Sequence, residues 1–208
     1  MLYLLVILMS LQPPFADRVQ DAYAHEDAET LRSLLQTADS RTDSLLVRYR
    51  LYPLTENAAL LDDLPETFDD GTAREWALLS GLWSYRAGEA SIFSAVTYGR
   101  RSANLLETAQ SIDPDDPYVL LIGGQSLLFR PSIAGKDPDA AAKQFEQLAQ
   151  LAERGQTDGI PPVEAHTWKW LALKEADRTD EAHALHEELM RQSVAPLYQQ
   201  FLDDPPDV

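Results

Sequence analysis

The stretch that decides the fold is LLETAQSIDPDDPYVLLIGGQSLLF, residues 105–129. An apolar helical run ends at Ile112, and a second run begins after only five residues, Asp-Pro-Asp-Asp-Pro. Asp113 precedes a proline, which disfavours helical backbone, so the first helix should end there. Asp116 can cap the second helix, with Pro117 in its first turn, where no backbone donor is needed. The stretch therefore predicts two helices joined by a tight hinge.

Helix pairs are predicted on both sides of this hinge, over residues 71–194. Upstream, Thr72 and Glu75 form a capping box in front of apolar residues at helical spacing. Downstream, Asp137 and Pro138 repeat the arrangement of a cap followed by a first-turn proline. The runs VEAHTWKWLALKEA and TDEAHALHEELMRQS then form a further pair.

Two regions flank these pairs. Residues 17–70 are predicted to hold helices that cap or extend the array, since terminal repeats need atypical outer faces. Pro53 is expected to end one of these helices, because proline lacks a backbone donor. Residues 195–208 are predicted to form a short helix and a frayed acidic tail.

Gly123 and Gly124 interrupt an otherwise apolar helical run. Two glycines cost a helix roughly 2 kcal/mol relative to alanine. Such a cost indicates a packing reason, and the simplest one is the close approach of a neighbouring helix.

Residues 73–194 contain an internal repeat, which is the first feature to seek in an all-helical sequence. In the first copy the characteristic positions are Trp76, Leu79, Ser80 and Trp83 on one helix, and Ser102, Leu106, Ala109 and Pro114 on the next. In the second copy they are Leu120, Gly124, Leu127, Ala141, Phe145 and Leu148. In the third they are Trp168, Leu171, Ala172, Ala182 and Leu189.

This order of large, small and aromatic residues resembles the tetratricopeptide repeat (TPR) superfamily, as two or three degenerate copies. The phrase RPSIAGKDPDAAAKQFEQL is also similar to a TPR-like group of exported, uncharacterised bacterial proteins. The resemblance implies an all-α fold of antiparallel helix pairs, stacked as a short TPR-like α-α superhelix. It also implies that the concave face of that superhelix binds a partner.

Composition narrows the class of partner. The chain has 208 residues, no cysteine and a net charge of −17. The missing thiols exclude disulfides and thiol catalysis. A surface with this much negative charge repels phosphate backbones and anionic membranes. We therefore expect no nucleic-acid partner.

The charged residues also suggest a salt-adapted source. The 17 basic residues include only 4 lysines. An acidic surface with little lysine suits high salt, where screening relieves self-repulsion. The alternative is an ordinary acidic protein, and a melting temperature that does not rise with added salt would favour it.

The first 16 residues are predicted to be a signal peptide, with cleavage after Ala16. The apolar run MLYLLVILMSL has the length of a signal-peptide core and is too short to span a bilayer, which needs ~20 residues. No lysine or arginine precedes it, so a buried first helix and an uncleaved anchor stay as alternatives. We therefore predict a periplasmic or otherwise exported protein with no stable membrane span; the alternative location is the cytoplasm.

Few residues suggest chemistry. His183 and His186 share a helix face, but HEELM lacks the second histidine of the zinc-protease motif, so a solvated polar face is favoured. The stretch AGKDP lacks the earlier glycine and the Ser/Thr of a phosphate loop. We therefore predict no catalytic residue, no metal and no cofactor.

Aromatic and arginine residues near the ends of the first helices are the candidate binding residues. Tyr85-Arg86 and Phe129-Arg130 recur at matching positions, and both residue types are frequent in binding hot spots. The alternative is that both arginines offset helix C-terminal dipoles. Gln125 and Lys169 lie on the same class of helix. The predicted partner-binding residues are Tyr85, Arg86, Gln125, Phe129, Arg130 and Lys169.

These patterns favour a non-catalytic protein-binding module or scaffold of the bacterial cell envelope, with a protein or peptide partner. One alternative is an enzyme or small-ligand carrier with a pocket near residues 131–136. Another is a structural subunit that associates with a second copy of itself. Fold alone does not choose among these classes.

Overall fold

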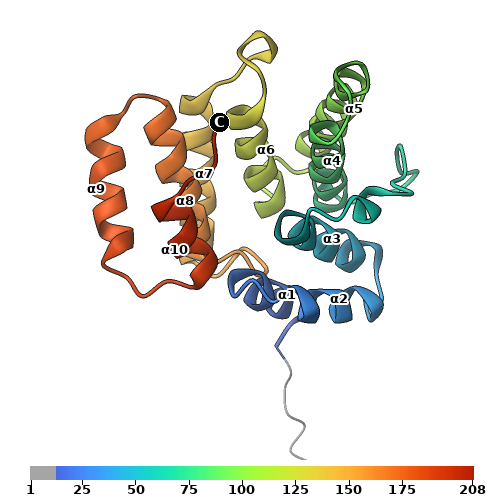
Figure 1. The fold of residues 1–208 in the computed structure, drawn as a ribbon, viewed down its shortest axis with the longest axis horizontal. Helices are drawn as coiled ribbons and strands as arrows, with labels where there is room; N and C mark the ends of the chain where they lie inside the picture. Colours follow the sequence, from blue (N-terminus) through green and yellow to red (C-terminus); the bar gives the residue numbers. More distant parts are fainter. Residues whose placement is uncertain (1–12) are drawn as a thin grey trace, which may run out of the picture.

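Residues 13–208, which a computed structural model describes, form ten α-helices and two short 3-10 helices, with no strand in this range (Figure 1). The helices are α1 (Phe15–Ala24), α2 (Ala28–Gln36), α3 (Arg41–Thr55), α4 (Ala73–Gly88), α5 (Ile92–Ile112), α6 (Pro117–Phe129), α7 (Pro138–Glu153), α8 (Pro162–Glu175), α9 (Thr179–Met190) and α10 (Pro196–Asp203). The 3-10 helices are η1 (Ala58–Leu61) and η2 (Ser132–Ala134).

The predicted fold class is confirmed: antiparallel helix pairs stack as a short TPR-like α-α array. The pairs α4/α5, α6/α7 and α8/α9 follow one another, and their first helices contact in the order α4, α6, α8. Of the second helices, α5 and α9 lie at opposite sides of the array, whereas α7 lies between α6 and α8 and packs on both (Figure 1). At the N-terminal end, α2 packs on α3, and α3 packs on α4.

The hinge has the predicted geometry. Helix α5 ends at Ile112, and Asp113 adopts extended backbone with φ −151°. The Asp116 carboxylate accepts from the backbone N–H groups of Tyr118 at 2.9 Å and of Val119 at 3.3 Å. The predicted caps at the starts of α4 and α7 are also present. These helix limits follow from cap chemistry that is local in sequence.

The paired glycines of α6 allow close packing, as predicted. A Cβ on Gly124 would lie 2.5 Å from the ring of Phe145 in α7, and one on Gly123 would lie 2.5 Å from the Gln144 side-chain oxygen. The two helices of this pair therefore approach more closely than alanines would permit.

The prediction that Pro53 ends its helix is wrong. Helix α3 continues through Pro53 to Thr55, and Glu56 ends it with a positive φ of 47°. A proline removes only its own donor, and here only two helical residues follow it. The disruption is therefore confined to the last turn.

The two ends of the described chain meet. Helix α10 contacts α8 and α9, and it also contacts α1. Residues 204–208 have no regular secondary structure, yet Val208 packs against the core. The tail predicted to fray is thus partly packed.

The predicted signal peptide lies largely outside the described residues. Ala16, its predicted last residue, lies in the first turn of α1 and packs against the core. Within residues 13–208, no helix has both the length and the apolar character needed to cross a membrane.

Candidate functional site

A buried ion pair joins α3 to α8 in the interior of the array. The side chains of Arg50 in α3 and Glu164 in α8 are each 2% exposed. Arg50 Nη1 donates to Glu164 Oε1 at 2.6 Å, and Nη2 donates to Oε2 at 3.1 Å. This two-point contact fixes orientation as well as distance. It joins helices that are far apart in the sequence.

Tyrosines and a glutamine surround this pair. The Tyr198 hydroxyl donates to Glu164 Oε2 at 3.3 Å, and the Gln20 amide donates to the Tyr198 hydroxyl. The Tyr23 ring lies 4.6 Å from Arg50 Cζ, and the rings of Tyr49 and Tyr118 lie within 6 Å of it. Helices α1, α3, α6, α8 and α10 all contribute to this central cluster. It therefore fills the inner face of the array here.

The electrostatics of the central cluster are those of a structural core. Burial raises the pKa of Tyr23 to about 12. Burial also raises the pKa of Tyr49 and of Tyr118. Burial alone would lower the pKa of Arg50, but the attraction of Glu164 and of the tyrosines holds it well above its ordinary value. The tyrosines thus stay neutral at ordinary pH, and none is tuned for proton transfer.

Two of the predicted binding residues lie at the edge of this cluster. The Tyr85 ring stacks on Tyr49, with centroids 5.6 Å apart, and on Tyr52 at 4.7 Å. The Tyr49 hydroxyl donates to the Gln125 side-chain oxygen. Both predicted residues are half-buried. Most of the surface of these two side chains therefore contacts other residues of the same chain.

The predicted cations also have partners within the chain. Arg86 donates to the Leu61 carbonyl at 3.1 Å, and its guanidinium lies 5.0 Å from the Trp83 ring centroid. Arg130 donates to the Ser126 carbonyl in its own helix at 2.8 Å, which fits the alternative of a helix-end contact. Lys169 pairs with Glu146.

Phe129 is the most exposed of the six predicted residues, and it contacts the Trp168 ring edge-on. The six residues therefore fall into separate places instead of forming one surface. Whether any of them binds a partner stays a prediction.

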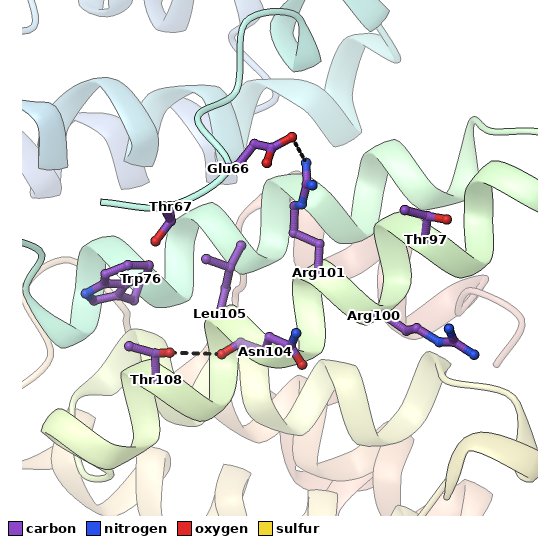
Figure 2. A pocket seen from close by; sticks show the side chains of 9 residues that line it. All are labelled: Glu66, Thr67, Trp76, Thr97, Arg100, Arg101, Asn104, Leu105 and Thr108. Carbon is purple, nitrogen blue, oxygen red and sulfur yellow. Dashed lines mark hydrogen bonds and ion pairs between the residues drawn. The ribbon is translucent and has the colours of Figure 1, made fainter. Parts of the chain in front are cut away.

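A groove runs along the outer side of α5, between that helix and the loop that leads to α4 (Figure 2). Its volume is about 460 Å³. Trp76 and Leu105 supply apolar surface, and polar side chains occupy the rest. The lining residues are Glu66, Thr67, Trp76, Thr97, Arg100, Arg101, Asn104, Leu105 and Thr108.

Several contacts hold the loop wall of this groove in place. Arg101 pairs with Glu66 at 2.9 Å, and the Trp83 indole N–H donates to the Pro65 carbonyl at 3.0 Å. The Phe68 ring packs edge-on against Trp76, with centroids 5.2 Å apart. The wall is therefore pre-formed, which lowers the entropic cost of binding.

The base of the same loop is held by ion pairs. Arg41 Nε donates to Glu75 Oε1 at 3.0 Å, and Arg41 also pairs with Asp70 at 3.2 Å. Hydrogen bonds from Arg41 are the main reason that the pKa of Glu75 falls to about 2. Glu75 is therefore ionised at neutral pH and anchors both α3 and the start of α4.

Most polar side chains of the groove lie on α5. Figure 2 shows Arg101 turned toward Glu66 and Arg100 turned away from it. No acidic side chain among residues 13–208 forms an ion pair with Arg100. Thr97, Arg100, Asn104 and Thr108 share one helix face, at spacings of three and four residues. The groove thus offers a free guanidinium, an amide and hydroxyls beside an indole ring.

Apart from Trp76, which the repeat pattern includes, the groove residues were missed by sequence reasoning. A polar stripe on a helix is the usual signature of a solvated face, so the α5 residues carry no distinctive signal. The loop beside the stripe has no periodic sequence pattern, so its course past α5 cannot be predicted.

A pocket near residues 131–136 was the alternative prediction. In the structure this loop forms η2, and the Ile133 side chain projects almost fully into solvent. The groove on α5 does not include this loop.

Comparisons with protein-family models, with curated proteins and with solved structures found no match to this chain.

Proposed function

We propose that this protein is a non-catalytic, TPR-like protein-binding module whose partner places an extended segment in the α5 groove. The observation that carries the proposal is the groove itself, with its fixed wall and the unpaired Arg100. The inner face is a weaker candidate, because the central cluster fills it.

The chemistry of the groove indicates the kind of segment. An extended chain offers backbone N–H and C=O groups. The Asn104 side-chain oxygen can accept from the N–H groups, and its nitrogen can donate to the C=O groups. The Arg100 guanidinium favours an acidic side chain on the bound segment, through a charge-assisted hydrogen bond. Trp76 and Leu105, which are 8% and 4% exposed, form a small apolar floor that an apolar residue of the segment can contact.

The test is selection of peptides from a random display library on the immobilised full chain. Binding of the selected peptides is then measured by fluorescence anisotropy with wild type and with Arg100→Glu and Asn104→Ala. Loss of a hydrogen bond to a charged group costs ~1.5–3 kcal/mol, so Arg100→Glu should weaken binding by about tenfold or more. Arg32→Glu is the matched control, because Arg32 is also exposed and lies on α2.

Equal binding to wild type and Arg100→Glu would place the peptide elsewhere and overturn the groove proposal. Selection of no peptide at all would count against protein binding through an extended segment. A change in emission from the Trp76 indole on binding would support the groove, provided that Trp76→Phe removes the change.

The cell-envelope location is part of the same proposal. Its support is the apolar run of the first residues. Mass spectrometry of the protein recovered from its host tests it: a mature N-terminus at Asp17 is expected, and an intact Met1 would contradict cleavage.

A further inference from the structure

A second cavity lies between η1 and the turn that joins α4 to α5. Its volume is about 270 Å³, and it shares no lining residue with the α5 groove. Charged side chains of both signs line it, namely Arg86, Asp62 and Glu89. Hydroxyl groups complete its polar lining, from Ser91, Ser94 and Tyr98. The cavity therefore offers binding groups for a ligand that itself carries both charges.

Arg86 is held in place without an acidic partner. Its guanidinium donates to the Leu61 carbonyl at 3.1 Å, and it lies 5.0 Å from the ring centroid of Trp83 and 5.3 Å from that of Tyr98. It forms no ion pair with an acidic side chain of residues 13–208. A guanidinium has five N–H donors in fixed directions, so one contact leaves others free. Arg86 can thus bind a carboxylate through two parallel hydrogen bonds.

Glu89 lies one helical turn after Arg86 but does not pair with it. A spacing of three residues ordinarily lets opposite charges meet on a helix. Here the Tyr52 hydroxyl donates to Glu89 Oε1 at 2.6 Å, while Arg86 is bound to the Leu61 carbonyl. Each charge is therefore held by its own neighbour. The cavity keeps opposite charges unpaired and in place, which lowers the entropic cost of binding a ligand between them.

We propose that this cavity binds a free α-amino acid with a small side chain. The carboxylate of the ligand accepts hydrogen bonds from Arg86. Its ammonium group, which has three donors, binds Glu89 and can also reach an oxygen of Asp62. The hydroxyl of Ser94 can donate to the ligand carboxylate or accept from its ammonium group.

Size and charge favour this class of ligand. The cavity is smaller than the ~300–1,000 Å³ of pockets for drug-sized molecules, so its ligand must be small. An amino acid has no net charge at neutral pH, so the net charge of −17 does not repel it. A simple carboxylate would meet that repulsion and leave Glu89 without a partner. A simple amine would leave Arg86 without one.

The test is binding of the twenty common amino acids to the full chain. A ligand raises the melting temperature of the protein that binds it, so this rise serves as the first screen. Isothermal titration calorimetry then measures affinity, and we expect saturable binding of one or more of glycine, alanine and serine. Their N-acetyl and amide derivatives each lack one charge, so each should bind at least about tenfold more weakly.

Two variants separate a ligand contact from a change in the fold. Arg86→Gln should weaken binding of the amino acid at least about tenfold but leave binding of its amide unchanged, because the amide has no carboxylate. Glu89→Gln should weaken binding of the amino acid but not of its N-acetyl derivative, which has no ammonium group. Arg32→Gln and Glu29→Gln, at exposed residues of α2, are the matched controls and should bind like wild type.

The absence of saturable binding by any of the twenty amino acids would overturn the proposal. So would derivatives that bind as tightly as the amino acid, since the cavity would then recognise neither charge. Equal losses of amino-acid and amide binding in Arg86→Gln would contradict the carboxylate contact. The proposal does not rest on peptide binding: the two cavities have separate linings, so either can fail alone.

Discussion

The inner side of the helix array and the outer face of α5 are built from similar helices but differ in what covers them. On the inner side, Tyr118 is fully buried, and Gly124 receives the ring of Phe145. On α5, Phe93 is almost fully exposed, and Gly99 faces open space. The same residue types, an aromatic and a helical glycine, thus have opposite surroundings.

Whether a helix face becomes core thus depends on whether another segment of the chain packs over it. Helices α1, α3 and α10 close over the inner side, so its aromatic residues become core. No described helix returns over the outer face of α5. The surface that we propose for a partner therefore lies on the outside of this array, whereas the TPR resemblance implies one on the concave face.

The largest predicted effect is on the inner side. Glu164→Ala should lower the free energy of unfolding by about 3–5 kcal/mol, because it leaves Arg50 buried without its partner. Urea denaturation followed by circular dichroism measures the change. Glu164→Gln, which keeps the shape and a hydrogen-bonding oxygen, should lower it less and is the variant to use if alanine prevents folding.

The double variant Arg50→Met with Glu164→Leu removes both charges, whereas Glu164→Ala removes only one. It should be more stable than Glu164→Ala, because no charge is left buried. A Glu164→Ala variant within about 0.5 kcal/mol of wild type, the range of an ordinary surface change, would show that the central cluster does not hold the array closed.

The two glycines give the next comparison. Gly124→Ala should destabilise the chain by about 1–3 kcal/mol, because the new methyl group meets Phe145. Gly99→Ala should stabilise it by up to about 1 kcal/mol, because its site is open and alanine favours a helix. Both are measured by urea denaturation in dilute protein. Effects of the same sign would break the distinction between the two faces.

Glu75, at the base of the groove wall, predicts a pH dependence of stability. The folded-state pKa of Glu75 is about 2, below its ordinary 4.5, because Arg41 hydrogen-bonds its charged form. Its stabilising contribution is therefore present above about pH 4.5 and is lost as the pH falls toward 2. Glu75→Gln should cost about 1–2 kcal/mol at neutral pH, since Arg41 is partly exposed.

The gap between wild type and Glu75→Gln should narrow as the pH falls through this window, as measured by urea denaturation at several pH values. Asp43→Asn, the same acid-to-amide change at a half-buried residue in the first turn of α3, is the control and should show a much smaller gap. A gap that is constant with pH would mean that the Arg41 contact is not what stabilises Glu75.

Local features of the fold could be predicted from sequence because their chemistry is local. The cap at Asp116 depends on residues that are near in sequence. The close approach at Gly124 could be inferred because glycine in a helix has a clear energetic cost. The continuation of α3 past Pro53 was missed because a proline near a helix end disrupts little.

The site could not be predicted, because it depends on contacts between distant segments. Nothing in RYRLY distinguishes Arg50, whose partner Glu164 is 114 residues away. Tyr85 and Gln125 were correctly placed on first helices, but their surroundings depend on Tyr49, which α3 supplies. The groove likewise needs the loop of residues 62–72 to return over α5.

The smallest predicted effect is at Phe93. Phe93→Ser should change the free energy of unfolding of the dilute chain by less than about 0.5 kcal/mol, because the phenyl ring contacts solvent in the monomer. Phe145→Ser, the same change on the inner side, should cost ~3–5 kcal/mol. If Phe93→Ser were to cost more than about 1 kcal/mol in dilute protein, its ring would have to be covered within one chain. In that case the outer face of α5 would be core like the inner side, and the contrast between the two faces would not stand.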